Sequence, residues 1–380
     1  MDQVSNYSSS SRLTIDKLDK LCSYDEFLQQ YLMPNKPCIL PFELVKDWPT
    51  YKVWLPAGKD RNNDLNDSNS LDPAFAILAK KYGDHKVPIV VENMKEENDS
   101  ENRFERQEIC LSQAIEKMAQ EKRRGDARIY VKDWHMIRQE RTLHGLSSEE
   151  PYKTPFLFAD DWMNNVKSNT DDDFRFCYAG SAGTRTIIHR DVYTSYSWST
   201  NIIGRKLWRL FPPSVKVHLR RFPQNPNSEL AKGVEELEVL KAKDQLKPIS
   251  KGGIGWPEWE TAMKECYEIV QESGETIFVP SDWHHEVINL TDCISLNHNW
   301  CNSCNIQSMY KSMCEEVEKT EEAISDVQTM LQDDASAANS LEWQFEWTKI
   351  VQNIVAMNAG WAWEGFWSMI LHNLENPPAR

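Results

Sequence analysis

The chain has 380 residues, of which 40% are hydrophobic and 27% are charged, as is typical of a folded globular protein. Its formal net charge of −15 argues against a nucleic-acid-binding surface, which needs clustered Lys and Arg. The first residues are polar, and the 9 Cys are odd in number and scattered, unlike a secreted disulfide framework. We therefore expect a reduced compartment, first the cytoplasm and second the nucleus, with no direct contact to nucleic acid or membrane.

The first part of the chain predicts a mixture of helices and strands. Residues 1–11 are predicted to be disordered, and apolar residues near helical spacing predict a helix over residues 11–31. The next predicted elements are a strand at 37–40, a loop at 58–70, a strand at 87–91, an exposed charged segment at 95–102, a helix at 111–122 and a strand at 127–132. Residues 12–150 thus read as an N-terminal α/β region.

The centre of the chain, from residue 174 to about 302, changes to short β-rich runs separated by Gly, Pro and Asn. The predicted strands are 174–178, 186–189, 196–203, 206–211, 276–279, 286–290 and 294–300. Many short strands with turn signals favour a sandwich or a barrel. Residues 214–273 are predicted to be an insertion between strands.

Beyond Ser303 the pattern is helical as far as Leu374. The most apolar stretch, residues 354–371, contains Asn358, Gly360 and Glu364 and has no uninterrupted apolar run of about 20 residues. We therefore predict a packed helix there and no membrane span.

The motif His189-Arg190-Asp191 is the central chemical signal. Side chains alternate between the two faces of a strand, so His189 and Asp191 project to one side and Arg190 to the other. One strand would then offer an imidazole and a carboxylate to the same metal ion. Alone the motif is weak, because H-x-D often occurs by chance.

A second histidine motif strengthens the interpretation of the first as part of a metal site. Trp283, His284 and His285 follow a predicted strand and a loop. A third ligand from there would complete the face of two His and one carboxylate that is typical of non-haem iron(II) oxygenases. Spacing does not decide between His284 and His285, since neighbouring strand residues point to opposite faces. Two packed, hydrogen-bonded histidines are the alternative.

Several further motifs occur in a fixed order along the chain. They lie at residues 130–135, 158–162, 186–191, 198, 204–208, 211–213, 274–285 and 297–300. Together they cover most of residues 37–305 and resemble the JmjC family of iron(II)/2-oxoglutarate oxygenases. The similarity is closest to its hydroxylase branch, and within that to the JmjC-domain-containing protein four group of lysyl hydroxylases.

The resemblance implies a mostly β fold with flanking helices. Its core is a double-stranded β-helix, a jelly-roll and cupin-like arrangement, expected here over residues 151–303, with C-terminal helices over 304–380. The family pattern Pro-x-x-Trp-x-His places the metal ligand two residues after Trp283, which selects His285. His284 is then expected to line the wall of the site.

The resemblance also implies a 2-oxoglutarate site. Lys206 matches the family lysine that binds the distal carboxylate, and Thr186 matches a hydroxyl donor. Tyr130 matches a phenol on an earlier strand, and Asn299 matches an amide near the co-substrate or metal. The alternatives are Arg205 as the true cation, an ordinary strand Thr at 186, and core packing for Tyr130.

Three further features remain open at this point. Tyr193, just past the ligand strand, and Trp283 are candidates for contact with the substrate. Cys301-Asn302-Ser303-Cys304 could bind zinc, although chance thiols are the better explanation without a second such motif. The C-terminal helices resemble the bundle through which related hydroxylases dimerise, so a homodimer is one expectation.

The expected activity follows from the resemblance. It implies iron(II), 2-oxoglutarate and O₂, with ascorbate as reductant, and release of succinate and CO₂. The closest group implies hydroxylation of a lysine side-chain carbon in a translation termination (release) factor. The first rival is a histone lysine demethylase with the same metal site. The second is a non-catalytic, cupin-like binding protein, which the fold alone would permit.

Overall fold

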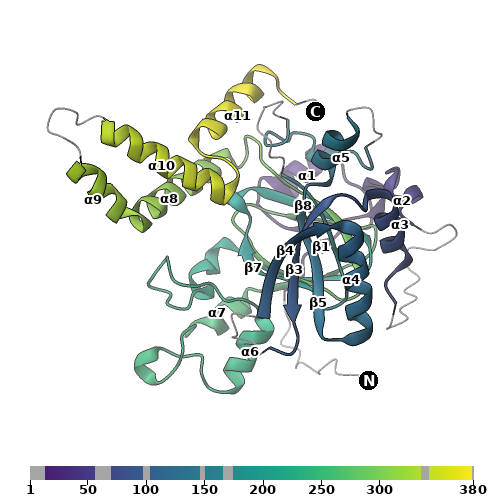
Figure 1. Ribbon diagram of the computed structural model, residues 1–380, viewed down its shortest axis with the longest axis horizontal. Helices are drawn as coiled ribbons and strands as arrows, with labels where there is room; N and C mark the ends of the chain where they lie inside the picture. The colour runs from purple at the N-terminus through teal and green to yellow at the C-terminus, as the bar shows by residue number, and fades with distance from the viewer. Residues whose placement is uncertain are drawn as a thin grey trace.

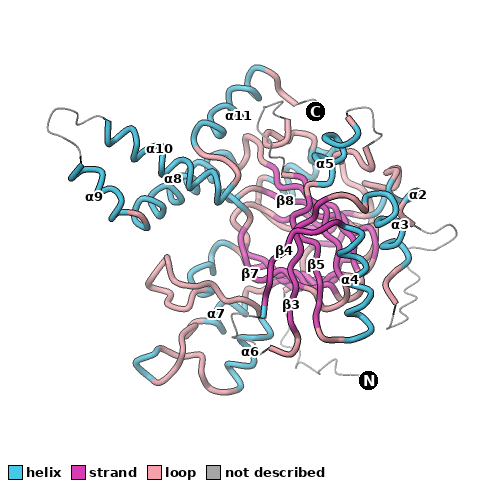
Figure 2. Tube along the Cα trace, in the orientation of Figure 1, coloured by secondary structure: helices cyan, strands magenta, loops and turns pink. Residues whose placement is uncertain are grey.

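The computed structural model describes residues 13–55, 70–96, 103–145, 150–165, 174–334 and 342–378. The predictions for residues 1–11 lie outside these ranges, as do those for nearly all of 58–70 and most of 95–102. Within them the strands form two sheets at the centre of the molecule, with helices around them (Figures 1 and 2).

The larger sheet has nine strands in the order β1-β2-β11-β8-β13-β6-β5-β3-β4, and the smaller has four in the order β10-β9-β12-β7. The strand bounds are β1 Asp16–Lys17, β2 Cys38–Leu40, β3 Lys86–Asn93, β4 Phe104–Cys110, β5 Ala127–Trp134, β6 Arg175–Gly180, β7 Arg185–Arg190, β8 Tyr196–Ile203, β9 Lys206–Phe211, β10 Tyr267–Gln271, β11 Thr276–Val279, β12 His284–Asn289 and β13 Cys293–Trp300. After β6 the chain alternates between the sheets, except that β9 and β10 follow one another in the small sheet, and this is the arrangement expected of a double-stranded β-helix.

Helices flank the sheets on the N-terminal and C-terminal sides (Figure 1). The α-helices are α1 Tyr24–Phe27, α2 Thr50–Val53, α3 Pro73–Tyr82, α4 Leu111–Arg124, α5 Met136–His144, α6 Val234–Ala242, α7 Trp259–Lys264, α8 Ile306–Ala323, α9 Ser325–Asp334, α10 Glu342–Ala359 and α11 Trp363–Glu375. None of the helices in the described ranges is long and apolar enough to cross a membrane. The predicted fold class is thereby confirmed.

The outer face of the large sheet holds the main hydrophobic core. Strand β8 is buried along its whole length, because both of its faces are covered. Trp198 on this strand stacks on Phe158, with ring centroids 5.7 Å apart and an interplanar angle of 10°. Phe27 from α1 meets Phe158 and Phe278 edge-on. This aromatic layer supports the strands whose other face lines the cavity described below.

Two predicted boundaries differ from the structure. Residues 11–31 do not form one helix: Asp16 and Lys17 pair in parallel with β2, and helix α1 begins only after Ser23. The Ser23 side chain accepts a hydrogen bond from the backbone of Glu26, whose carboxylate accepts one from the Ser23 backbone. This capping box fixes the helix start, and the sheet takes the preceding residues.

The second difference lies in residues 214–273, predicted as an insertion. Strand β10 falls inside this range and pairs antiparallel with β9, from Tyr267↔Leu210 to Gln271↔Lys206. The part that lies outside both sheets is therefore shorter, and it contains α6 and α7 packed on Phe211 and Ile188. The strand-favouring residues Tyr267, Ile269 and Val270 were a local signal for this strand that the sequence analysis did not use.

The turn between β8 and β9 requires glycine at position 204. Gly204 has φ +82°, and a Cβ added there would lie 2.1 Å from the carbonyl oxygen of Asp292. The turn is further held by a hydrogen bond from Asn201 Nδ2 to the Gly204 carbonyl. Because Lys206 begins the next strand, the conformation of this turn sets the position of its side chain.

We predict that Gly204→Ala lowers the free energy of unfolding by about 2–4 kcal/mol, from left-handed strain together with the backbone clash. The matched control is Gly125→Ala, where φ is +75° but nothing lies within 4 Å of the added Cβ. The control should cost only about 1–2 kcal/mol. Urea unfolding of both variants measures the difference, and equal losses would contradict the steric explanation.

Candidate metal and co-substrate site

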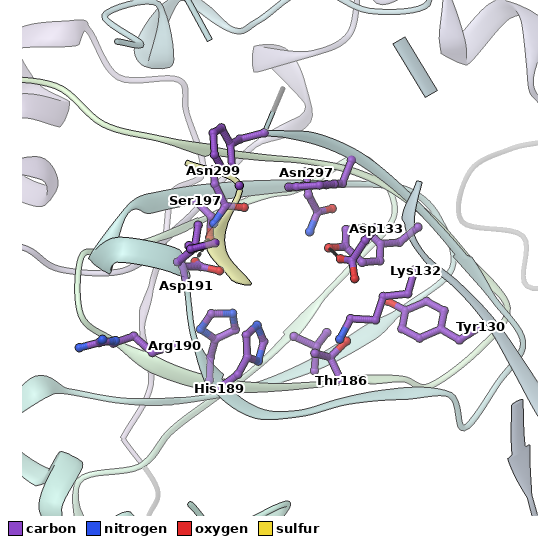
Figure 3. Close-up of a pocket in the computed structure, with 18 of the residues that line it drawn as sticks. Tyr130, Lys132, Asp133, Thr186, His189, Arg190, Asp191, Ser197, Asn297 and Asn299 are labelled. Carbon is purple, nitrogen blue, oxygen red and sulfur yellow. Dashed lines mark hydrogen bonds between the residues drawn. The ribbon is translucent and has the colours of Figure 1, made fainter. Parts of the chain in front are cut away.

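A cavity of about 390 Å³ lies between the two sheets. Strands β5, β6, β8 and β13 of the large sheet form one wall, and β7, β9 and β12 of the small sheet form the other. Polar and charged side chains from both walls point into the space between them (Figure 3). Of the predicted site residues, the cavity collects His189, Asp191, His285 and the set Lys206, Thr186, Tyr130 and Asn299.

Three of these residues form a cluster suited to a metal ion. His285 on β12 lies directly opposite His189 on β7, and their rings are 4.2 Å apart between centroids. Asp191 follows the end of β7 in an extended conformation, so it still projects to the side of His189. The ligand atoms of the three lie within 4.8 Å of one another. No other His, Cys, Asp and Glu group in the described ranges offers such a cluster.

Hydrogen bonds orient each of the three candidate ligands. Nδ1 of His189 lies 2.8 Å from the Ile187 carbonyl oxygen, and Nδ1 of His285 lies 3.3 Å from that of Trp283. A carbonyl oxygen only accepts, so each Nδ1 carries the proton and each Nε2 offers its lone pair. Burial, and then the neighbouring ring, lower the pKa of His189, which keeps that imidazole neutral.

The carboxylate is held in the same manner. Ser197 Oγ on β8 donates to Asp191 Oδ2 at 2.7 Å, which leaves Oδ1 directed to the cavity. This serine is a residue that the sequence analysis missed. Nothing in a lone Ser on a predicted strand identifies it, although it lies only 6 residues after Asp191, because the short turn at Val192–Thr194 is what brings the two side chains together.

A β-bulge explains how Thr186 shares the cavity with His189. The two residues are three apart, so strict alternation would place them on opposite faces of β7. The register shifts between His285↔His189 and Val287↔Thr186, so two steps on β12 match three steps on β7. The extra residue on β7 returns Thr186 to the cavity side. The resemblance found this residue, whereas strand periodicity alone would have rejected it.

Lys206 lies at the deep end of the cavity. Its side chain is only 2% exposed, and its Nζ donates a hydrogen bond to Ser295 Oγ at 2.8 Å. Burial lowers the pKa of Lys206. Arg205, the alternative cation, points away from the cavity and pairs with Glu272. The ammonium group of Lys206 is thus the cation available to an anion inside the fold.

Tyr130 and Asn299 complete the predicted set. Tyr130 on β5 is buried, and burial raises the pKa of its phenol, whose hydrogen bond to Thr186 acts in the opposite direction. Asn299 on β13 donates from Nδ2 to Ser195 Oγ at 3.1 Å. Its place near Asp191 and Ser197 puts it at the metal end, while Tyr130 lies at the far end (Figure 3).

Further cavity residues were not singled out from the sequence. Asn297 on β13 points into the cavity, and its Oδ1 accepts a hydrogen bond from Ser199. Lys132 and Asp133 on β5 line the wall near Tyr130 and lie within a quoted motif, which was their only signal. Residues 358–360, at the end of α10, also border the cavity. The C-terminal helices therefore contribute to the site, which no local pattern predicted.

The two predicted substrate contacts have structural roles instead. Tyr193 is 3% exposed, has φ +50° and donates from its hydroxyl to the Trp361 carbonyl at 2.6 Å. Trp283 is also buried, and its Nε1 donates to the Asn35 carbonyl at 3.0 Å. Neither lines the cavity. Closeness in sequence to a metal ligand did not predict the direction of these two side chains, because the chain turns towards other elements at both points.

His284 and the Cys motif also lie away from the cavity. His284 faces Arg190 on the other side of the small sheet, where burial and then Arg190 lower its pKa to about 3. The expectation that it lines the wall is wrong. Cys301 is buried against Met369, whereas Cys304 is exposed. The sequence places His298 upstream, but its Nε2 bonds the Tyr152 hydroxyl in the core, so the described residues form no zinc site there.

Comparison with known proteins agrees with this geometry. The family model described as "Cupin-like domain" matches residues 24–306. The Gallus gallus protein "2-oxoglutarate and iron-dependent oxygenase JMJD4" is 32% identical over 84% of this chain and 69% of its own length. The Arabidopsis thaliana "Arginine-specific demethylase JMJ20" is 30% identical over 83% of this chain and 63% of its own.

A Caenorhabditis briggsae protein named "Bifunctional arginine demethylase and lysyl-hydroxylase psr-1" is 25% identical over 78% of this chain and 64% of its own length. The aligned region spans about two thirds of the length of these three relatives. The chain belongs to the cupin-like JmjC family of 2-oxoglutarate and iron-dependent oxygenases, as its motifs predicted.

The buried ammonium of Lys206 should reduce the stability of the ligand-free protein. We predict that Lys206→Met raises the free energy of unfolding by about 1–3 kcal/mol near neutral pH, since a charge no longer has to be buried. The pKa of Lys206 is lowered on folding, so the unfolded chain binds more protons and wild-type stability rises with pH up to the ordinary value of 10.5. The difference in the free energy of unfolding between Lys206→Met and the wild type should therefore become smaller as the pH rises towards 10.5.

Urea unfolding at several pH values measures this effect. The matched control is Lys216→Met, whose ammonium is half exposed and pairs with Asp282. It should change stability by less than about 0.5 kcal/mol. A Lys206→Met variant that is less stable than the wild type at every pH would contradict the account.

Proposed function

We propose that this chain is an iron(II)- and 2-oxoglutarate-dependent protein hydroxylase that acts on a lysine side-chain carbon, with a translation termination (release) factor as its substrate. One observation carries the proposal. A single cavity holds the cluster of His189, Asp191 and His285 and, at its deep end, the buried ammonium of Lys206. A group of possible metal ligands alone is a common feature. Such a group together with a buried ammonium in the same cavity suits a metal and a dicarboxylate bound side by side.

The residues present fit both groups. Two imidazoles and one carboxylate on one side of the cavity would leave the other side of an iron ion open. Lys206, Thr186 and Tyr130 offer an ammonium and two hydroxyl donors to the distal carboxylate of 2-oxoglutarate. When bound, iron and 2-oxoglutarate supply the oxidising power, with O₂ consumed and succinate and CO₂ released.

The chain itself contributes binding, orientation and exclusion of water. The two carbonyl acceptors behind His189 and His285 fix the ring tautomers, and Ser197 fixes the carboxylate. Trp208 stacks on His285, with centroids 5.7 Å apart, and covers that ring from the small sheet. A closely packed wall of this kind excludes water from behind the ring and strengthens the electrostatic contacts there.

The choice of lysine hydroxylation rests on resemblance. The motifs are most similar to the lysyl hydroxylase group, and the name of one relative includes lysyl hydroxylation. The names of two relatives include arginine demethylation, which makes removal of a methyl group the second candidate reaction. The net charge of −15 is compatible with a cationic target in either case.

Asp191→Ala should abolish succinate formation and target oxidation while leaving the fold intact, because its loss removes one of three metal ligands and a single hydrogen bond. The assay contains iron(II), ascorbate, 2-oxoglutarate and the recombinant release factor, and mass spectrometry reads the target. Gain of one oxygen atom supports hydroxylation, and loss of a methyl group supports demethylation. Wild-type activity in the variant would remove the metal assignment. No succinate from the wild type would favour a non-catalytic binding protein.

We further propose that the protein forms a homodimer through its C-terminal helices. Trp367, Leu371 and Leu374 recur along α11 at the spacing of one helix face and are all more than half exposed. Helices α8, α9 and α10 extend away from the sheets (Figure 1). An apolar stripe on an outer helix of this kind is typical of a protein interface.

Leu371→Glu should therefore shift the protein from dimer to monomer, because a charge would have to be buried in the interface. Light scattering would report about twice the 44.2 kDa chain mass for the wild type and the chain mass for the variant. Val239→Glu, on the exposed face of α6, is the control and should remain dimeric. A monomeric wild type at all concentrations would disprove the assembly.

A further inference from the structure

Asp133 reaches the cavity through an irregularity of strand β5. The pairing of β5 with β6 shifts between Val131↔Ala179 and Trp134↔Cys177, so three steps on β5 match two on β6. Asp133 lies in this bulge with φ +60°, a left-handed conformation that costs energy in a residue other than glycine. As a result, the neighbours Lys132 and Asp133 both line the cavity, which a regular strand would not allow.

The carboxylate of Asp133 is held by one hydrogen bond and interacts electrostatically with the neighbouring Lys132, without an ion-pair contact. The Tyr178 hydroxyl on β6 donates to Asp133 Oδ1 at 2.6 Å. Within the described ranges, no Lys, Arg or His nitrogen forms an ion pair with Asp133, and Oδ2 has no hydrogen-bond donor. The residue is exposed to solvent at the cavity, in contrast to the deeply buried Lys206. Figure 3 shows the carboxylate pointing into the space in front of the candidate metal ligands.

The charges of the cavity divide between its two ends. Lys206 at the buried end forms no ion pair in the described part of the chain, and its ammonium suits the distal carboxylate of 2-oxoglutarate. Lys132 lies on the wall beside Asp133 and interacts with it electrostatically without forming an ion pair. The carboxylates that line the cavity are Asp191, which belongs to the metal cluster, and Asp133. Asp133 is therefore the cavity carboxylate that lies outside the metal cluster and is open to a second, cationic ligand that enters from solvent.

We propose that Asp133 binds the cationic end group of the target side chain and so sets the requirement for an unmethylated lysine. The inference rests on the proposed function and names the residue that recognises its substrate class. A carboxylate accepts hydrogen bonds from an ammonium group, and each methyl added to the nitrogen removes one donor. Tyr178 is a positioning residue, because it fixes one oxygen of Asp133 and leaves the other for the target.

The test removes the charge of Asp133 in the protein and, separately, the ammonium group of the target side chain in the peptide. Wild-type protein and Asp133→Asn are loaded with Mn²⁺ in place of iron and with 2-oxoglutarate, so that no turnover occurs. Binding of a fluorescent random heptapeptide library with central lysine, and of the matching library with central norleucine, is measured by anisotropy. Asparagine keeps the size of aspartate and tolerates the left-handed conformation, so the substitution removes mainly the charge.

We expect Asp133→Asn to weaken binding of the lysine library about tenfold or more, and to leave binding of the norleucine library unchanged. Tyr178→Phe should show the same selectivity with a smaller loss. Trimethylation of the lysine should weaken binding to the wild type and have little further effect in Asp133→Asn. The matched control, Asp126→Asn, replaces an exposed carboxylate before β5 and should change neither library.

Two results would overturn the inference. One is equal binding of the lysine and norleucine libraries to the wild type, and the other is an equal loss for both libraries in Asp133→Asn, which indicates a structural role. The proposed function is tested apart from this, by succinate release from the iron-loaded wild type in the presence of the recombinant release factor. Absence of succinate would count against the oxygenase, while the binding comparison would still decide the role of Asp133.

Discussion

The pairing register of β7 and β12 is the constraint on which the site depends. It places His285 directly opposite His189, and the shift after this pair brings Thr186 back to the same face. A register moved by one residue would send His284 to the cavity and His285 to the other side of the sheet. The aromatic layer behind the large sheet and the elements packed on the small sheet hold this register. The geometry of the metal-ligand cluster therefore depends on the packing of the whole fold.

Much of the site was predictable because its residues lie in motifs with local spacing. His189 and Asp191 follow from strand alternation, and the family register selected His285. The choice of Lys206 over Arg205 agrees with its position in the cavity. The central strands were predicted within a few residues, since short alternating runs between turn residues carry a clear signal.

The remaining features depend on turns and on strand pairing, which the composition of a segment does not encode. Ser197 meets Asp191 because the backbone turns between β7 and β8, and the bulge that exposes Asp133 is defined by its partner strand. Tyr193 and Trp283 were misassigned because sequence proximity to a ligand says little about direction once the backbone turns. Strand β10 was missed although Tyr267, Ile269 and Val270 favour a strand, because the short run directly follows a helical segment.

The central claim is that one iron ion and one 2-oxoglutarate molecule share this cavity. A crystal structure grown without oxygen, with iron and 2-oxoglutarate and with anomalous diffraction recorded at the iron edge, tests it most directly. The account predicts one iron peak bonded to His189, Asp191 and His285, with the distal carboxylate of the co-substrate on Lys206. An iron peak held by other protein ligands, or a co-substrate that leaves Lys206 on Ser295 alone, would contradict it.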